Sequence, residues 1–229
     1  MWQSLKVQFL RWYYRWANHR SWSKTDLSDV ISTDISLAGD ECDLRARMYQ
    51  PQHDHERQLL IFMHGGGWVM GDLVTHDPFC RLLARHLSST VIALDYRLAP
   101  EHRYPAAAED CIAATHWILA NRSRLKLKAS NVVVVGDSAG GNLAAVVANQ
   151  LARELPGQLN GQILICPVVR HYSHPTQSYV ENGAGYGLTL SLVTWFWDTY
   201  PKNVNGHSGT CGFGRRFRGR STNPIWARI

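Results

Sequence analysis

Short apolar runs alternate along this chain with longer segments in which apolar residues recur every three or four positions. Continuous runs of aliphatic and β-branched residues predict buried β-strands. These runs lie at 59–63, 91–94, 132–135 and 162–166. Helical periodicity predicts helices at 78–87, 105–121 and 143–152. Strands that alternate with helices predict an α/β fold, with a mainly parallel sheet and helices on both faces.

The N-terminal part of the chain departs from this alternation. Residues 34–50 alternate apolar and polar positions around a Gly-Asp pair, which predicts a β-hairpin at the sheet edge. Before it, large apolar residues spaced by three and four, with basic residues between them, predict an amphipathic helix over 1–24. The apolar positions are Trp2, Leu5, Phe9, Trp12 and Trp16. We expect them to pack against their own domain, and contact with a membrane surface is the alternative.

The pattern changes again beyond residue 167. Residues 170–187 are polar and glycine-rich, and 188–200 predict an aromatic-rich helix. From residue 202 onward the chain has no apolar period. Such a segment cannot bury enough apolar surface to offset the entropy lost on ordering, so we expect 201–229 to be a disordered basic tail.

Charge and cysteine content narrow the class of protein. The net charge is +6, but 201–229 contain six basic residues and no acidic one, so 18 basic and 18 acidic residues remain in the body. We therefore expect no nucleic-acid partner for the body, and a basic-tailed binder of nucleic acid or membrane surfaces stays an alternative. The five cysteines are widely spaced and form no C-x-x-C pair. This spacing predicts reduced thiols in the cytoplasm and no metal site.

The valine run at 132–135 leads directly into Gly-Asp-Ser-Ala-Gly-Gly at 136–141 and then into the predicted helix. A serine between a strand and a helix, flanked by small residues, is typical of the G-x-S-x-G nucleophile elbow. The first turn of the following helix offers free N–H groups to a developing oxyanion. Ser138 is therefore the candidate nucleophile, and Ala139 is a candidate oxyanion donor. A phosphate-binding loop is disfavoured because no Gly-Lys-Ser/Thr follows.

A second glycine motif, His-Gly-Gly-Gly-Trp at 64–68, follows the strand predicted at 59–63. Glycines after a strand expose backbone N–H groups, and this H-G-G-G motif supplies the other half of an oxyanion hole in lipases and esterases. Gly65, Gly66 and Gly67 are the candidate donors. His64 precedes the serine and lies on this loop, so we expect it to orient the loop by hydrogen bonding.

These two motifs, together with Asp-Tyr-Arg-Leu-Ala-Pro-Glu-His at 95–102, resemble the hormone-sensitive-lipase-like branch of the α/β-hydrolases. The resemblance covers residues 1 to about 207. It implies an α/β-hydrolase fold with a helical cap and a serine carboxylesterase that acts on short or medium acyl esters without a cofactor. It also implies a division into an N-terminal cap helix region (1–30), a hydrolase core (31–170) and a cap segment (171–200), followed by the basic tail.

The resemblance ends before the catalytic acid and base. In the family these residues follow the serine after two further strands, and the sequence predicts no such strands. Asp198 and His207 follow Ser138 in the right order, but one lies on the predicted cap helix and the other in the tail. We therefore expect a chain truncated or frameshifted after about residue 207, which lacks the C-terminal strands. A catalytically inert hydrolase fragment is the alternative to an active esterase.

Overall fold

Six strands form one sheet in the computed structural model of the protein, which describes residues 2–22, 25–39, 42–52 and 58–201. They are β1 (Val30–Gly39), β2 (Cys42–Pro51), β3 (Gln58–Met63), β4 (Thr90–Leu94), β5 (Asn131–Asp137) and β6 (Gly161–Ile165). The order across the sheet is β1-β2-β4-β3-β5-β6. The last four strands of this order are parallel, and β1 and β2 form an antiparallel hairpin at one edge. The predicted mainly parallel sheet and edge hairpin are confirmed.

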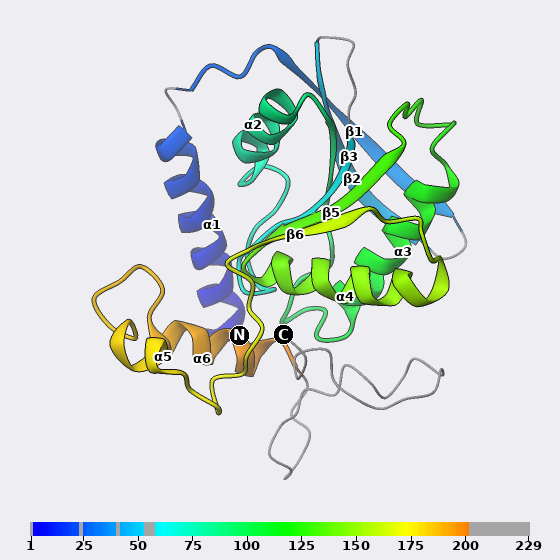
Figure 1. Ribbon diagram of the computed structural model, residues 1–229. Coiled ribbons are helices and arrows are strands. Elements are labelled where there is room, and N and C mark those ends of the chain that lie inside the picture. Colours follow the sequence, from blue (N-terminus) through cyan, green and yellow to red (C-terminus); the bar gives the residue numbers. More distant parts are fainter. Residues whose placement is uncertain (1, 23–24, 40–41, 53–57, 202–229) are drawn as a thin grey trace.

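Helices cover both faces of the sheet, as predicted. Figure 1 shows α2 on one face and α3 and α4 on the other, with α1, α5 and α6 gathered beyond one end of the strands. The helices are α1 (Trp2–Trp22), α2 (Asp77–Leu87), α3 (Ala106–Ala120), α4 (Ala139–Glu154), α5 (Gln177–Glu181) and α6 (Leu190–Thr199). The short α5 lies in the polar segment where the sequence indicated no helix. The tail predicted to be disordered lies outside the described residues from 202 onward.

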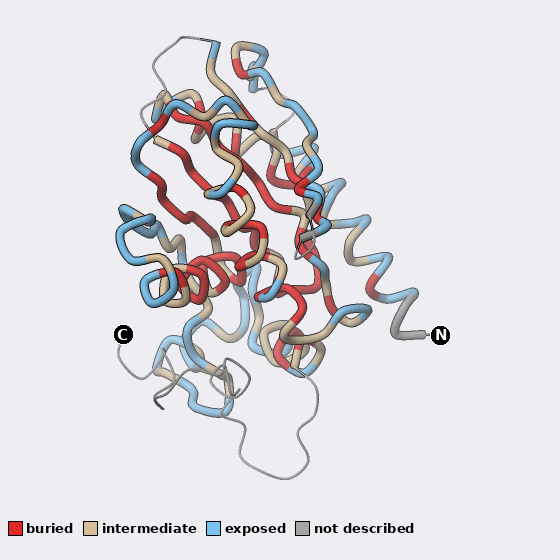
Figure 2. Tube along the Cα trace, turned by 90° about the vertical axis from the view of Figure 1, so that its right-hand side faces the viewer, coloured by how far each residue is buried: buried red, intermediate tan, exposed pale blue. Residues whose placement is uncertain are grey.

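The central strands are buried on both sides because successive side chains point to opposite faces. Leu60 and Phe62 of β3 pack in the apolar cluster under α2, whereas Ile61 and Met63 pack in the cluster under α3 and α4. Figure 2 shows the buried residues running along these strands. Burying a side chain of this size stabilises the fold by roughly 1.5–3 kcal/mol. The strands that precede the two glycine motifs are therefore well packed.

The N-terminal segment is helical as predicted, but its apolar stripe does not pack against the domain. Leu5, Phe9, Trp12 and Trp16 are 58%, 62%, 59% and 47% exposed. The opposite side of α1 makes the contacts instead, and Val7 in the middle of that side is 2% exposed. None of the helices in the described residues is long and apolar enough to cross a membrane.

Polar anchors explain this orientation of α1. The Arg11 guanidinium donates hydrogen bonds to the carbonyl oxygens of Val69 and Ala99 and to the carboxylate of Glu101. Arg15 forms an ion pair with Asp72 at 2.5 Å. Because these arginines must face the domain, the aromatic stripe is turned toward solvent. Periodicity alone could not reveal this, since it identifies a helix face without saying what covers that face.

The predicted aromatic helix near the C-terminal end of the described chain is confirmed as α6. Its residues pack against the loop that follows β3. The Trp197 ring meets the Trp68 ring edge-on at 5.0 Å, and Tyr200 stacks on Trp68 at 4.6 Å. Aromatic pairs with this geometry stabilise by about 0.5–1.5 kcal/mol beyond the area that they bury. The glycine loop after β3 is therefore held between the sheet and α6.

Candidate active site

Ser138 sits in a sharp turn between β5 and α4. Its backbone has φ 53° and ψ −116°, a conformation that residues with a side chain rarely adopt. The turn is held on both sides, because the Ser138 N–H donates to Ile165 O at 2.8 Å and its carbonyl accepts from Val168 N–H at 3.1 Å. This is the strained strand–turn–helix geometry that a nucleophile elbow requires.

Small residues allow the strand and helix of this turn to come close together. A Cβ atom on Gly140 would lie 2.0 Å from Met63 O, and one on Gly136 would lie 2.2 Å from Gly140 O. No real Cβ atom tolerates such distances, so both positions require glycine. The first turn of α4 is thereby pressed against the end of β3, beside the glycine loop.

The glycine loop at 65–67 runs out from the end of β3. Gly66 and Gly67 have φ 118° and 62°, and a Cβ atom on Gly67 would lie 2.3 Å from the Phe196 ring. Within the described residues no acceptor takes the backbone N–H of either glycine. Ala139 is the first residue of α4, so its N–H has no carbonyl one turn earlier in the helix. These three donors are available for an oxyanion.

The backbone N–H of Gly65 already has a hydrogen-bond acceptor within the protein, which its motif did not indicate. The Gly65 N–H donates to Asp137 Oδ1 at 2.8 Å, so this N–H is not free for an oxyanion in the structure, and we do not propose Gly65 as a donor. A Cβ atom at this position would lie 2.1 Å from Asp137 Oδ2. The carboxylate before the nucleophile thus binds the glycine loop directly to the elbow. The sequence carries one signal of this role, which is the acidic residue at the first x of G-x-S-x-G.

His76 adds a second contact to this carboxylate. Its Nε2 atom lies 3.5 Å from Asp137 Oδ1, and its ring stacks against His64 at 5.4 Å. Burial acts to raise the pKa of Asp137, but hydrogen bonding and charge from His76 outweigh it, so this pKa lies below its ordinary value. Asp137 is therefore ionised at neutral pH and can accept hydrogen bonds from both neighbours.

His64 lies at the base of the glycine loop, where it can orient the loop. Its Nδ1 donates to Gly65 O at 2.8 Å, and Tyr96 OH donates to His64 O at 2.6 Å. The Tyr96 ring also stacks on the imidazole at 4.2 Å. Burial lowers the pKa of His64 to about 4, so the ring is neutral at pH 7. A neutral, buried imidazole with its Nδ1–H bound to a carbonyl is suited to holding a loop.

No described residue acts as a base on Ser138. The Ser138 hydroxyl makes no hydrogen bond with another described residue, and His171 binds Ser173 Oγ at 2.7 Å instead. Asp198 is exposed and accepts a hydrogen bond from Tyr172 OH at 2.8 Å. His207 lies outside the described residues. The structure therefore brings together the candidate nucleophile and the candidate oxyanion donors, and among the described residues it places neither Asp198 nor a histidine in hydrogen-bond contact with Ser138.

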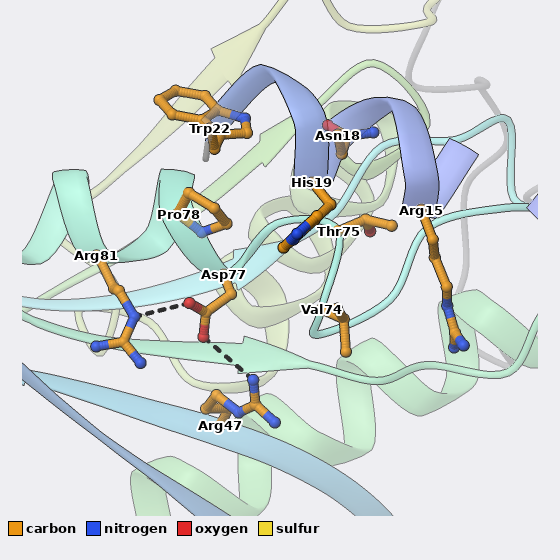
Figure 3. A pocket seen from close by; sticks show the side chains of 10 residues that line it. All are labelled: Arg15, Asn18, His19, Trp22, Arg47, Val74, Thr75, Asp77, Pro78 and Arg81. Atoms are coloured by element: carbon orange, nitrogen blue, oxygen red, sulfur yellow. Dashed lines mark hydrogen bonds and ion pairs between the residues drawn. The ribbon is translucent and has the colours of Figure 1, made fainter. Parts of the chain in front are cut away.

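A cavity of about 430 Å³ between α1 and α2 lies away from the serine. Figure 3 shows that charged side chains line it, with Asp77 between Arg47 and Arg81 at 3.1 and 2.7 Å. Ser138 is not among its lining residues. Because its charges pair with one another, this cavity is not suited to an acyl chain. In the described part of the chain, no group of His, Cys, Asp and Glu is placed to hold a metal ion.

Comparisons with known proteins agree with this geometry. A family model for the alpha/beta hydrolase fold matches residues 60–211. The carboxylic ester hydrolase LipN of Mycobacterium tuberculosis is 41% identical over 182 residues, which are 76% of this chain and 47% of LipN. An ethyl acetate hydrolase of Pseudomonas putida is 40% identical over 183 residues, which are 77% of this chain and 57% of the relative. The chain thus spans about half the length of the curated relatives that it matches.

Solved structures show the same relationship. An esterase of Pyrobaculum calidifontis is 36% identical, with a TM-score of 0.78 over 86% of this chain and 64% of that one. The thermostable carboxylesterase EstE1, cloned from a metagenomic library, is 35% identical, with a TM-score of 0.79 over 85% of this chain and 67% of that one. The predicted fold class and family resemblance are confirmed. The chain belongs to the α/β-hydrolase fold family, in the branch of carboxylic ester hydrolases that resembles hormone-sensitive lipase.

Proposed function

We propose that this chain carries the nucleophile and the oxyanion hole of a serine carboxylesterase acting on short or medium acyl esters. The observation that carries the proposal is the strained turn at Ser138, pressed against a glycine loop with free N–H groups. The names of the relatives, a carboxylic ester hydrolase and an ethyl acetate hydrolase, support the same reaction class.

In the proposed reaction, Ser138 Oγ attacks the carbonyl carbon of the ester and passes its proton to a base. The carbonyl oxygen becomes an oxyanion that accepts hydrogen bonds from the N–H groups of Gly66, Gly67 and Ala139. Collapse of this intermediate releases the alcohol and leaves an acyl-serine. Water then attacks the acyl carbon through a second oxyanion, which frees the acid and restores Ser138.

The rate depends on the base. A serine hydroxyl is a weak nucleophile at neutral pH, and removing the histidine of a comparable hydrolase costs about 10⁶ in kcat. This loss corresponds to roughly 8 kcal/mol of transition-state stabilisation. Because no described histidine contacts Ser138, we expect the 229-residue chain to turn over slowly. His207 is the one histidine of this chain that follows the described residues.

The test is hydrolysis of p-nitrophenyl butyrate by the chain and by Ser138→Ala, with Ser173→Ala as a matched control at an exposed serine. The proposal predicts slow turnover that Ser138→Ala abolishes and Ser173→Ala leaves unchanged. Equal rates for the chain and Ser138→Ala would overturn the proposal and favour the inert-fragment alternative. A lower turnover rate in His207→Ala than in the parent chain would identify His207 as the base.

We also infer that α1 and the segment with α5 and α6 act together as the cap. The Lys6 ammonium lies 5.4 Å from the centre of the Trp195 ring, which links α1 to α6. Both helices also contribute residues to the larger apolar cluster of the core. Replacing Trp195 with alanine should therefore loosen both segments together, measured as faster amide exchange in each.

We further infer a cytoplasmic location. Cys80 and Cys111 are buried free thiols, and Cys166 is an exposed free thiol. Exposed unpaired thiols persist in reducing compartments, which supports this location. Fractionation of the native cells tests it, and recovery of the protein outside the cytoplasm would contradict it.

A second candidate function follows from the exposure of the apolar side of α1. Packing against the domain was the expected role of these aromatic residues, and the structure does not show it. We therefore propose that α1 contacts a membrane surface, since a helix with aromatic and basic residues is typical of segments that lie in the lipid interface. Co-sedimentation of the chain with lipid vesicles tests this contact.

A further inference from the structure

The exposed side of α1 forms one continuous strip along the helix. We call it the aromatic stripe, formed by Leu5, Phe9, Trp12, Tyr13 and Trp16. At about 100° per residue, its aliphatic, phenylalanine and tryptophan members fall within about 60° of one another around the helix. We propose that this stripe binds flat on an anionic lipid surface. The inference rests on the membrane contact proposed above and adds the class of lipid and the orientation of the helix.

The composition of the stripe matches the interfacial zone of a bilayer. Tryptophan and tyrosine prefer this zone because their rings combine an apolar body with a polar N–H or O–H group. Neighbouring rings touch, with Phe9 and Trp12 at 5.9 Å and Tyr13 and Trp16 at 5.9 Å. The strip is therefore a preformed apolar surface, and little side-chain order has to be gained on binding.

The charges beside the stripe select anionic headgroups. Residues 2–22 contain four basic side chains, one histidine between two of them, and no acidic residue. At 100° per residue, Lys6 borders the stripe on one side and His19 borders it on the other, while Arg20 falls between the positions of Phe9 and Tyr13. Arg15 is paired with Asp72 and is not counted among these charges. Arg20 lies over the Trp16 ring at 5.7 Å, so its charge stays beside the apolar strip. A cation near such a surface favours binding to anionic lipids by about fivefold.

The opposite side of α1 keeps the stripe facing outward. Val7 is buried in the core, and Arg11 binds Glu101 and two backbone carbonyls of the domain. Binding at the stripe therefore breaks none of these contacts. Figure 1 shows α1 standing at the outside of the molecule with its length free of the sheet. The helix can lie on a surface while the hydrolase core stays folded behind it.

Two other occupants of the stripe are disfavoured by charge. In a symmetric contact between two copies, α1 would meet its own equivalent, and the basic side chains of both copies would come together. The segment at 202–229 carries six basic residues and no acidic one, so it would meet α1 with like charge. An anionic lipid surface has the complementary charge and an apolar layer beneath it for the rings.

The test is co-sedimentation of the full 229-residue chain with vesicles of phosphatidylcholine alone and of phosphatidylcholine with phosphatidylglycerol. The double variant Phe9→Ser with Trp12→Ser removes the centre of the stripe. Ile31→Ser is the matched control, because Ile31 is 54% exposed on β1 and lies outside the stripe. Arg20→Gln removes one cation beside it. Circular dichroism verifies that each variant is folded.

We expect the chain to bind the mixed vesicles and the double variant to bind them at least about tenfold more weakly. Ile31→Ser should bind like the chain, and Arg20→Gln should bind about fivefold more weakly. Equal binding of the chain to both vesicle types would overturn the anionic selectivity while leaving the membrane contact standing. If the chain bound neither type of vesicle, both the anionic selectivity and the membrane contact would be overturned. Undiminished binding of the double variant would overturn the stripe and assign the lipid contact to the basic tail.

Discussion

A residue next to the candidate nucleophile holds the backbone of the other motif in place. Asp137 precedes the nucleophile, and its carboxylate accepts the Gly65 N–H of the other motif at 2.8 Å. The relative position of the elbow and the glycine loop is thus set by one charge-assisted hydrogen bond. Oxyanion stabilisation depends on donors held in place before the reaction, so we expect this bond to contribute to catalysis without touching the substrate.

The first residue-scale prediction concerns this bond. Asp137→Ala leaves the Gly65 N–H without its acceptor, and an unsatisfied buried donor costs about 1–3 kcal/mol. Asp137→Asn keeps an oxygen acceptor at nearly the same place and should retain most of the stability. Urea unfolding measures both variants. Equal unfolding free energies for Asp137→Ala and the parent chain would show that the bond does not hold the loop.

The second residue-scale prediction concerns pH. Burial lowers the pKa of His64 to about 4 in the folded chain, whereas the ordinary histidine value is about 6.5. Between these values the unfolded chain binds a proton that the folded chain does not, so stability is full above pH 6.5 and falls as the pH falls toward 4. The total loss from this group is about 3 kcal/mol.

Urea unfolding between pH 7.5 and pH 4.5 tests this expectation, with His64→Asn as the control. The variant has no titrating group at this position, while every other acidic and basic group is the same in both proteins. Its unfolding free energy should therefore vary less steeply with pH than that of the parent chain. If the unfolding free energies of the two proteins changed equally with pH, His64 would not be the group that causes the loss of stability at low pH.

At the scale of elements, apolar pattern was enough to predict the strands. The valine run became the centre of β5, and the alternating segment became the hairpin of β1 and β2. Strands and long helices depend on local pattern and burial, which a sequence displays directly. The elbow at Ser138 was predictable for a similar reason, because glycine at 136 and 140 reports a close approach of strand and helix.

Features that depend on contacts distant in sequence could not be predicted in this way. The outward turn of the α1 stripe follows from Arg11 meeting Glu101, which lies 90 residues away. The Gly65 N–H is taken by Asp137, 72 residues later. Neither partner is marked by spacing or periodicity. Both features therefore depend on side-chain pairing between parts of the chain that are distant in sequence.

The element-scale prediction concerns β6. This strand pairs with β5 on one side, and among the described strands none pairs with its other side. Ile163 is 42% exposed on it, and an apolar edge strand is a template for pairing with another chain. We therefore expect the 229-residue chain to self-associate as its concentration rises, and Ile163→Lys to reduce this association.

Light scattering across a concentration series measures the effect. Val74→Lys is the matched control, since Val74 is 59% exposed in a loop away from β6 and the substitution adds the same charge. The proposed role of the β6 edge would be contradicted if the parent chain stayed monomeric at every concentration. It would also be contradicted if both substitutions reduced self-association equally.

At the scale of the whole molecule, the fold brings two glycine motifs to the same end of neighbouring parallel strands. β3 pairs with β5 in register from Gln58 to Met63, so the loops that follow them emerge side by side. α6 packs over one of these loops, and α4 starts beneath the other. Two cavities lined by described residues lie elsewhere, between α1, α2 and the hairpin. The register of β3 and β5 in the sheet is what brings the two motifs of this site together.

We propose above all that Ser138 is a selectively reactive nucleophile beside a formed oxyanion hole. The most direct measurement is covalent labelling with an alkyl fluorophosphonate, in which the serine oxygen bonds to phosphorus and fluoride leaves. Labelling is stoichiometric, so it detects a slow nucleophile that turnover assays miss. Peptide mapping by mass spectrometry locates the adduct in the chain, in Ser138→Ala and in the control Ser173→Ala. We expect one adduct per chain, located at Ser138, absent in Ser138→Ala and unchanged in Ser173→Ala. Labelling spread over surface hydroxyl groups, equal in all three proteins, would contradict this proposal.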